Sequence, residues 1–180
     1  VLLGLFPLIA RKIVEVVQKR KVYAKWASVR PQIFDRNLIV IGAGAGGLVS
    51  AYIAAAVKAK VTLIEAHKMG GDCLNYGCVP SKALIKTATL VRQMKHSATY
   101  GIAKAEATFS FADVMDRVAR VVREIEPHDS VERYSGLGVD VVQGYARIVN
   151  PWTVEIDVGE GKKQVLKTRS SVIATGAMPF

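Results

Sequence analysis

Residues 37–47 read Asn-Leu-Ile-Val-Ile-Gly-Ala-Gly-Ala-Gly-Gly, a short apolar run followed at once by a glycine-rich loop. The apolar run is typical of a parallel strand that is buried on both faces. The loop has the pattern Gly-x-Gly-x-x-Gly through Gly42, Gly44 and Gly47, and Ala-rich sequence that favours a helix follows it. A second apolar run at 61–65 completes a β-α-β unit with parallel strands.

The glycine loop also predicts a ligand. Its first glycine allows a tight turn, the second lets a diphosphate approach the backbone, and the third lets helix and strand pack closely. The helix N-terminus that follows attracts the negative diphosphate. Glu65 ends the second strand 18 residues after Gly47, where its carboxylate can accept hydrogen bonds from a ribose. This context favours a dinucleotide site over a glycine-rich turn without a ligand.

The remaining sequence continues an α/β pattern. After a loop over residues 70–79, Pro80 is favourable in the first turn of a helix. Ser110 predicts the start of a third helix, because its hydroxyl can cap the helix and Asp113 stands three residues further on. Pro127 is expected to end or kink this helix.

Beyond Gly138 the apolar residues alternate with polar ones. Runs at 139–145, 147–157 and 163–167 therefore predict an antiparallel β-meander, and 171–175 is again typical of a buried strand. The fold class we predict is α/β: a Rossmann-like, doubly wound parallel sheet with an antiparallel β-meander. Thr175 and Gly176 follow the last strand, where small residues let a ligand lie against the backbone.

Length and composition support one globular unit and exclude other classes. The 180 residues are 51% hydrophobic and 22% charged, which argues against disorder. Two cysteines cannot build a disulfide-rich scaffold or a four-cysteine zinc site. No apolar stretch reaches the roughly 18–20 residues of a membrane span.

Positive charge gathers at the N-terminal end. Residues 1–36 hold eight Lys or Arg and two acidic residues, so they contribute +6 of the formal net charge of +10. The excess positive charge therefore belongs mainly to this one segment and does not indicate a nucleic-acid-binding domain. Residues 1–10 are nearly all apolar and basic residues follow, an order that is wrong for a signal peptide and typical of the cytoplasmic end of a membrane helix. An amphipathic surface helix, with Ile13 and Val16 on one face, is the alternative.

The segment 70–82 reads Gly-Gly-Asp-Cys-Leu-Asn-Tyr-Gly-Cys-Val-Pro-Ser-Lys, with four residues between its two cysteines. Cys73 and Cys78 can close a small disulfide. Cys78 lies just before the helix expected from Pro80, where the helix dipole and Lys82 favour a thiolate. We expect Cys78 to have the lower pKa and Cys73 to be the more exposed.

Thiol–disulfide exchange suits this arrangement best. A metal site is the rival interpretation, but only His67 and His96 are near in sequence and neither has finger-like spacing. No metal-ligating residue is therefore predicted. Buried inert thiols are the third alternative.

Together these residues resemble the flavoprotein disulfide reductases, the family of dihydrolipoamide dehydrogenase, glutathione reductase and mercuric reductase. The resemblance runs from about residue 37 to 180, and the cysteine segment 70–82 is highly specific to that family. Ser81-Lys82 is similar to the lipoamide and mercuric branch. Residues 125–134 are most similar to mercuric-reductase homologues.

The resemblance implies that the dinucleotide is FAD. Its diphosphate would lie on Gly42, Gly44, Ala45 and Gly47, and its adenosine ribose on Glu65. Lys82 would lie near the flavin ring, Cys73 would be the thiol that meets substrate, and Cys78 would face the flavin. Further cofactor contacts are expected from Gly71, Gly144, Thr175 and Gly176.

The resemblance also implies an enzyme that passes electrons from NAD(P)H through FAD to the Cys73–Cys78 disulfide, and on to a disulfide or metal-ion substrate. A homodimer and a role in cell redox homeostasis are implied for the full-length protein. A second Gly-x-Gly-x-x-Gly for NAD(P)H and a C-terminal dimerisation domain are missing from the sequence. We therefore expect an incomplete FAD-binding domain, with a non-catalytic FAD-binding module as the alternative.

Two units follow from this division of the chain. Residues 1–36 are expected to be a basic juxtamembrane segment and linker, the end of a truncated membrane domain. Residues 37–180 are expected to be the N-terminal part of the FAD-binding domain. The expected location is the cytoplasm, at the inner face of the cell membrane if the first segment is membrane-derived.

Overall fold

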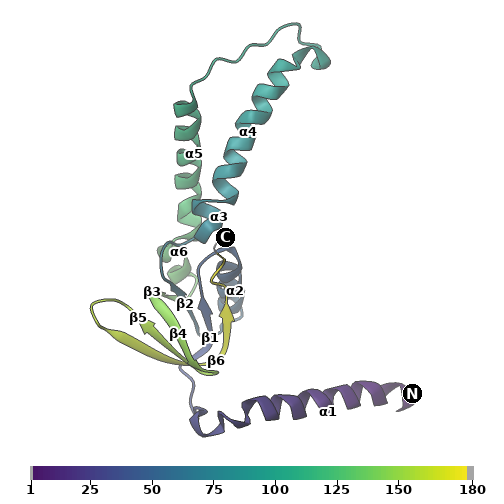
Figure 1. The fold of residues 1–180 in the computed structure, drawn as a ribbon, viewed down its shortest axis with the longest axis vertical. Helices are drawn as coiled ribbons and strands as arrows, with labels where there is room; N and C mark the ends of the chain where they lie inside the picture. Colours follow the sequence, from purple (N-terminus) through teal and green to yellow (C-terminus); the bar gives the residue numbers. More distant parts are fainter. Residues whose placement is uncertain (1, 178–180) are drawn as a thin grey trace.

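A six-stranded sheet organises the chain between Arg36 and Ile173 (Figure 1). The structure is a computed structural model that describes residues 2–177, with side chains described from residue 7 onward. In chain order the elements are α1 (Leu2–Ala24), η1 (Ala27–Val29), β1 (Arg36–Ile41), α2 (Ala45–Ala56), β2 (Val61–Glu65), α3 (Gly71–Asn75), α4 (Cys78–Lys95), η2 (Ser97–Tyr100), α5 (Phe111–Ile125), η3 (Glu126–Asp129), α6 (Val131–Gly136), β3 (Val139–Gln143), β4 (Tyr145–Asn150), β5 (Thr153–Asp157) and β6 (Lys163–Ile173).

The strand order is β3-β2-β1-β6-β5-β4. The first four strands in this order pair in parallel, and β6, β5 and β4 pair antiparallel. One face of the parallel part packs against α2 and α6 through a buried apolar cluster that includes Val40, Leu48, Leu63 and Tyr134. The predicted doubly wound parallel sheet with an antiparallel meander is therefore confirmed.

The opposite face of the sheet is covered by the meander itself. Ile39 and Ile64 of the parallel strands pack against Val154, Ile156 and Leu166 in a second buried cluster. The apolar residues of β1 alternate between the two clusters, because successive side chains of a strand point to opposite faces. This explains why β1 reads as a continuous apolar run.

Two strand predictions were wrong, one in its partner and the other in its extent. We expected 139–145 to begin the meander, but β3 pairs in parallel with β2 at the edge of the sheet. A half-exposed edge strand alternates in the same way as a meander strand, so its pattern does not identify its neighbour. The runs predicted at 163–167 and 171–175 are one strand, β6. The strand continues through the polar residues around Thr168, because Thr168 is fully buried and its N–H donates a hydrogen bond to the Trp152 carbonyl at 2.8 Å.

The loop expected at 70–79 contains a helix and the start of another. Helix α3 includes Cys73, and α4 begins at Cys78, so this cysteine is the first helical residue and does not precede the helix. Pro80 still lies in the first turn, where its missing N–H is not needed. The later helix signals are confirmed: the Ser110 hydroxyl accepts a hydrogen bond from the Asp113 N–H at 3.1 Å, and α5 ends at Ile125, just before Pro127.

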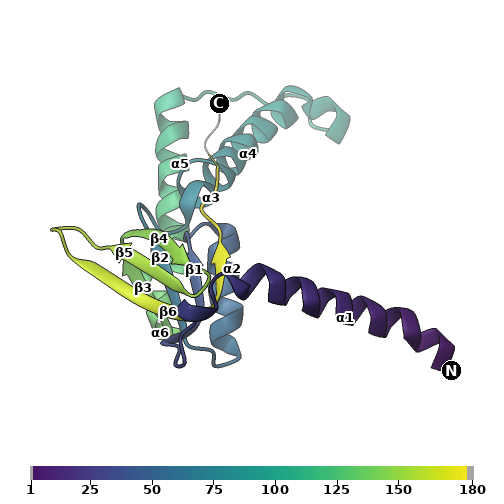
Figure 2. The same ribbon diagram turned by 60° about the horizontal axis from the view of Figure 1, so that its bottom comes forward.

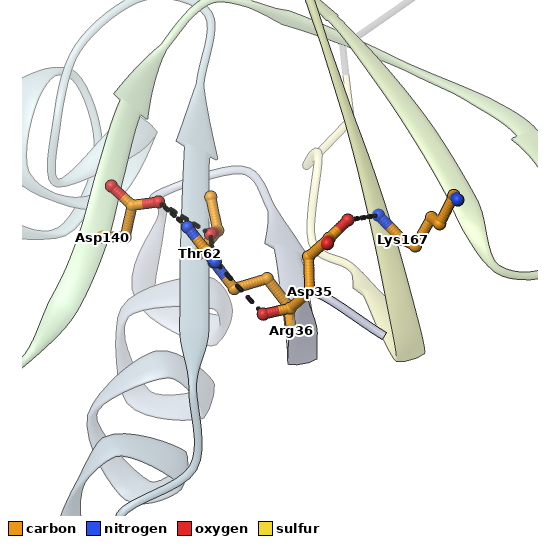
Figure 3. A network of polar contacts seen from close by, with 5 residues as sticks. All are labelled: Asp35, Arg36, Thr62, Asp140 and Lys167. Atoms are coloured by element: carbon orange, nitrogen blue, oxygen red, sulfur yellow. Dashed lines mark hydrogen bonds and ion pairs between the residues drawn. The ribbon is translucent and has the colours of Figure 1, made fainter. Parts of the chain in front are cut away.

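Asp35 and Arg36, on either side of the start of β1, make polar contacts with neighbouring strands. Figure 3 shows Arg36 beside Thr62 and Asp140, which lie on β2 and β3. The Arg36 Nε donates to the buried Thr62 hydroxyl at 2.6 Å, and its Nη2 lies 2.7 Å from the Asp140 carboxylate. Asp35 accepts a hydrogen bond from the Lys167 N–H at 2.8 Å. The Arg36 contacts join β1, β2 and β3, and the Asp35 contact joins the linker to a fourth strand, β6.

Helix α1 extends away from the sheet, at the end opposite the α4–α5 hairpin (Figures 1 and 2). Within residues 2–177 no helix is both long and apolar enough to cross a bilayer. The division into units at residue 36 stays a prediction, and residues 1 and 178–180 of the two expected units lie outside the described residues.

Candidate functional site

A cavity of about 1110 Å³ opens at the carboxyl ends of β1, β2 and β6. The chain leaves β1 for β2 on one side, while β6 lies on the other, so the cavity lies where the strand order reverses. Doubly wound sheets bind ligands at this switch point. Nine of the twelve predicted site residues line the cavity: Gly42, Gly44, Ala45, Glu65, Gly71, Cys73, Gly144, Thr175 and Gly176. Gly47, Cys78 and Lys82 do not.

The glycine loop has the backbone geometry that its sequence requires. Gly42 has a φ of +101°, and a Cβ there would collide with the carbonyl of Ala174. A Cβ on Gly47 would collide with the carbonyl of Gly42, so Gly47 lets α2 pack against the end of β1. Its role in this structure is packing, which explains why it does not line the cavity.

Two glycines that line the cavity, Gly71 and Gly44, lie in close contact. Gly71 has a φ of +54°, and a Cβ there would lie 2.7 Å from the Cα of Gly44. Gly44 is also the N-cap of α2, and Ala45 in the first turn lines the cavity. The free N–H groups and the positive end of the helix dipole therefore face a space bounded by bare backbone. This cradle, which added side chains would fill, fits the diphosphate of a dinucleotide.

Glu65 is fixed in the cavity wall by two backbone hydrogen bonds. Its Oε2 accepts from the Ala43 N–H at 2.6 Å, and its Oε1 accepts from the His67 N–H at 2.7 Å. The residue is only 8% exposed. Each carboxylate oxygen can accept more than one hydrogen bond, so acceptor capacity remains for a ribose hydroxyl.

The two cysteines are free thiols joined by a side-chain hydrogen bond, and one of them lines the cavity. Cys73 on α3 is half-buried and lines the cavity, whereas Cys78 at the start of α4 is exposed. The expectation that Cys73 is the more exposed thiol was therefore wrong. The reason is α3, which the sequence did not predict and which turns Cys73 toward the cavity wall.

The surroundings raise the pKa of the Cys73 thiol above its ordinary value. The main cause is the hydrogen bond with the Cys78 side chain, followed by burial and by the charges of Cys78 and Asp129. The Lys82 ammonium acts in the opposite direction and lowers this pKa. Lys82 is exposed on α4 and does not line the cavity. Its predicted position near a flavin ring stays a prediction, and its described effect is that of its charge on Cys73.

Sequence reasoning missed several residues of this site. Asp129 was read only as part of the similar segment 125–134, yet its charge acts on Cys73 and burial raises its own pKa. His67 was considered only as a metal ligand, and Lys68 not at all, although both line the cavity. Their position directly after β2 was the available signal, because ligands bind at the carboxyl ends of parallel strands.

Another missed residue, Asn75, holds the cysteine segment in shape. Its Nδ2 donates to the carbonyls of Met69 and Gly71, at 3.1 and 2.8 Å.

Within residues 2–177 no three His, Cys, Asp or Glu side chains lie together as a metal site requires.

Comparison with known proteins gives a consistent picture. The family described as "Pyridine nucleotide-disulphide oxidoreductase" matches residues 36–180. Dihydrolipoyl dehydrogenase of Geobacillus stearothermophilus is 40% identical over 147 residues, which cover 81% of this chain and 31% of the relative. Leghemoglobin reductase of Vigna unguiculata is 33% identical over 177 residues, which cover 88% of this chain and 33% of the relative.

The chain thus spans about a third of the length of these curated relatives. Among solved structures, a Cu(II) complex of the HOCl-induced flavoprotein disulfide reductase RclA from Escherichia coli has a TM-score of 0.65. It is 21% identical, and the match covers 82% of this chain and 30% of that one. At this identity the likeness shows the fold alone.

Proposed function

This chain belongs to the pyridine nucleotide-disulphide oxidoreductase family, and on that premise we propose that it is the part of a flavoprotein disulfide reductase that holds FAD and contains the redox-active cysteine pair. The observation that supports this most directly is the shared cavity wall. It brings the glycine loop, Glu65 and Cys73 together, although they come from three separate parts of the sequence.

The residues present fit the cofactor. We propose that Gly42, Gly44 and Ala45 hold its diphosphate through backbone N–H groups and the α2 dipole. Glu65 accepts hydrogen bonds from its adenosine ribose. The remaining contacts are proposed for Gly71, Gly144, Thr175, Gly176 and, at the flavin ring, Lys82.

When bound, FAD supplies a redox centre between the donor NAD(P)H and the cysteine pair. Reduction of the Cys73–Cys78 disulfide consumes two electrons and two protons and gives two thiols. One thiolate then attacks a substrate disulfide, the mixed disulfide is resolved by the second cysteine, and two substrate thiols leave as the protein disulfide re-forms. A metal ion that accepts two electrons is the alternative substrate.

The roles of the two thiols are assigned by resemblance. Cys73 is proposed to meet substrate and Cys78 to face the flavin. Because Cys73 and not Cys78 lines the cavity in this structure, the assignment stays a prediction. Mass-spectrometric mapping of the mixed disulfide with a small substrate disulfide, in Cys73→Ser and Cys78→Ser variants, identifies the attacking thiol.

The main test uses the 180-residue chain with added FAD. Fluorescence titration should give one FAD per chain, and thiol titration should give two thiols after dithiothreitol and none after mild oxidation. A Cys73→Ser variant, which cannot close the internal disulfide, is the control. Two thiols that resist oxidation, or a bound zinc ion, would contradict the proposal.

The second candidate is a non-catalytic FAD-binding module. Its support is that the chain covers about a third of its relatives and contains a single Gly-x-Gly-x-x-Gly loop. NADPH oxidation distinguishes the two functions. A chain that binds FAD without consuming NADPH is a module by itself, whereas turnover would show that these 180 residues form a reductase.

A further inference from the structure

Helix α1 presents apolar side chains to solvent along most of its length. It extends from the sheet without lying on it (Figures 1 and 2). Its large apolar side chains are 43–63% exposed at Leu8, Ile9, Ile13, Val14, Val16, Val17 and Val22. Apolar surface of this extent in water indicates a partner.

Charge along α1 indicates which kind of partner. Its basic residues are Arg11, Lys12, Lys19, Arg20 and Lys21, and Glu15 is its one acidic residue. Lys12 lies 3.3 Å from Glu15, which leaves the turn Lys19–Lys21 as an uncompensated positive cluster. Exposed apolar side chains are thus frequent from Leu8 to Val17, and three of the five basic residues gather in the turn Lys19–Lys21.

We propose that α1 binds the surface of an anionic lipid bilayer. The exposed apolar side chains between Leu8 and Val17 enter the boundary of the acyl layer, while Arg11 and Lys12 extend to the headgroups and the basic turn Lys19–Lys21 lies among the phosphate groups. A second copy of the chain packed in parallel would bring a second cluster of the same charge against the first, whereas an anionic surface neutralises the cluster. This inference is independent of the redox function.

The C-terminal end of α1 is attached to the sheet by Trp152. The Tyr23 ring stacks on the Trp152 ring with 5.5 Å between centroids, and the Arg30 guanidinium lies 5.6 Å from the same ring. Trp152 is only 8% exposed and its carbonyl accepts a hydrogen bond from Thr168. The orientation of α1 is therefore coupled to that of the sheet.

Trp152 and the cavity lie at opposite ends of β1. Thr168, next to Trp152, pairs with Arg36 at the start of β1, whereas the cavity begins at Gly42, beyond its last residue. A bilayer that binds α1 would therefore meet the end of the domain away from the cavity. Substrates could still enter from the aqueous side.

Vesicle flotation of the 180-residue chain tests the proposal, because aggregated protein sinks and only bound protein floats. Vesicles of phosphatidylcholine alone are compared with vesicles that also contain phosphatidylglycerol. The chain should float with the anionic vesicles and not with the neutral ones. The Lys19→Glu/Lys21→Glu variant should lose at least about tenfold in affinity, since each reversed charge removes attraction to the anionic surface.

The matched control is Lys86→Glu/Lys95→Glu on α4, which has the same change in net charge and should float like the unchanged chain. An Ile9→Asp/Ile13→Asp variant should lose the binding that its apolar side chains provide. Absence of flotation, equal flotation with both lipid compositions, or equal loss in the control would overturn the proposal. So would a dimer in sedimentation velocity that Ile9→Asp/Ile13→Asp abolishes while no vesicle binding occurs.

Discussion

The Glu65 carboxylate holds the Ala43 N–H at 2.6 Å and so ties the end of β2 to the glycine loop that follows β1. The residue expected to bind a ribose therefore also shapes the loop expected to bind the diphosphate. Its second oxygen holds the N–H of His67 at 2.7 Å. Removal of the side chain would leave two backbone donors without these partners, and the Ala43 N–H is buried.

Glu65→Ala is expected to weaken FAD binding by about 1.5–3 kcal/mol, the range for hydrogen bonds to a charged group. It should also lower the melting temperature of the FAD-free chain, because the loop loses its tie to β2. Glu65→Gln keeps one carbonyl oxygen for Ala43 and should lose less of both. Fluorescence titration and thermal melts measure the two effects, with the exposed Glu106→Gln as control. Unchanged affinity in Glu65→Ala would show that the carboxylate does not bind the cofactor.

Two glycines of the same loop are expected to respond in opposite directions to alanine. Gly42→Ala should lower the free energy of unfolding by more than about 2 kcal/mol, because Ala is strained at a φ of +101° and its Cβ meets the Ala174 carbonyl. Gly46 lies in the first turn of α2 with open space at its Cβ, so Gly46→Ala should raise stability by about 0.4–1 kcal/mol. Urea unfolding measures both. Equal effects would show that the loop is not held in this conformation.

The reactivity of Cys73 should depend on the charges around it. Its raised pKa means that it forms less thiolate at neutral pH than an ordinary cysteine. Asp129→Asn removes a negative charge that disfavours the thiolate, so the pH midpoint of Cys73 alkylation should move down. Lys82→Gln removes a favourable positive charge, so the midpoint should move up. Mass spectrometry of the alkylated Cys73 peptide follows both midpoints, with Asp116→Asn as control. Shifts of the midpoint in the opposite directions would contradict the effects of Asp129 and Lys82 on Cys73.

The Arg36–Asp140 ion pair should show measurable coupling. Its side chains are 26% and 45% exposed, so solvent screens the pair only in part. A double-mutant cycle with Arg36→Gln and Asp140→Asn should give about 0.5–1 kcal/mol. The Lys104–Glu106 pair, 78% and 74% exposed, is the matched comparison and should give a coupling near zero. Equal coupling in the two pairs would show that the Arg36 contact at the base of the sheet has no special strength.

The sequence predicted the local features of the fold because local signals determine them. The run 37–41, the loop through Gly47 and the strand 61–65 form one short unit, and the Ser110 cap acts over three residues. The partner of β3 could not be predicted, since an alternating strand pairs as well with β4 as with β2. The division of β6 into two strands was an error of the same kind, because the polar run around Thr168 is extended only through contacts with Trp152 and β1.

In the candidate site, Gly42, Gly44, Gly47 and Glu65 could be predicted from spacing, whereas Gly71 and Gly144 were implied only by the family resemblance. Nine of the twelve predicted residues line one cavity. Two features could not be predicted. The exposures of Cys73 and Cys78 depend on α3, a helix of five residues that has no periodicity to detect. The charge of Asp129 reaches Cys73 only through the packing of η3, which lies more than fifty residues away in sequence.

The single long strand β6 also has a consequence for how the chain folds. β1 can pair with β2 as soon as the first β-α-β unit has been synthesised, but its other neighbour is β6, and the contact between Asp35 and Lys167 closes a loop of 132 residues. Contacts so distant in sequence slow folding, because the entropy of closing the loop is lost before the strands pair. During synthesis on the ribosome, one edge of β1 therefore stays open until the chain has emerged as far as β6, and an unpaired strand edge over this interval favours aggregation.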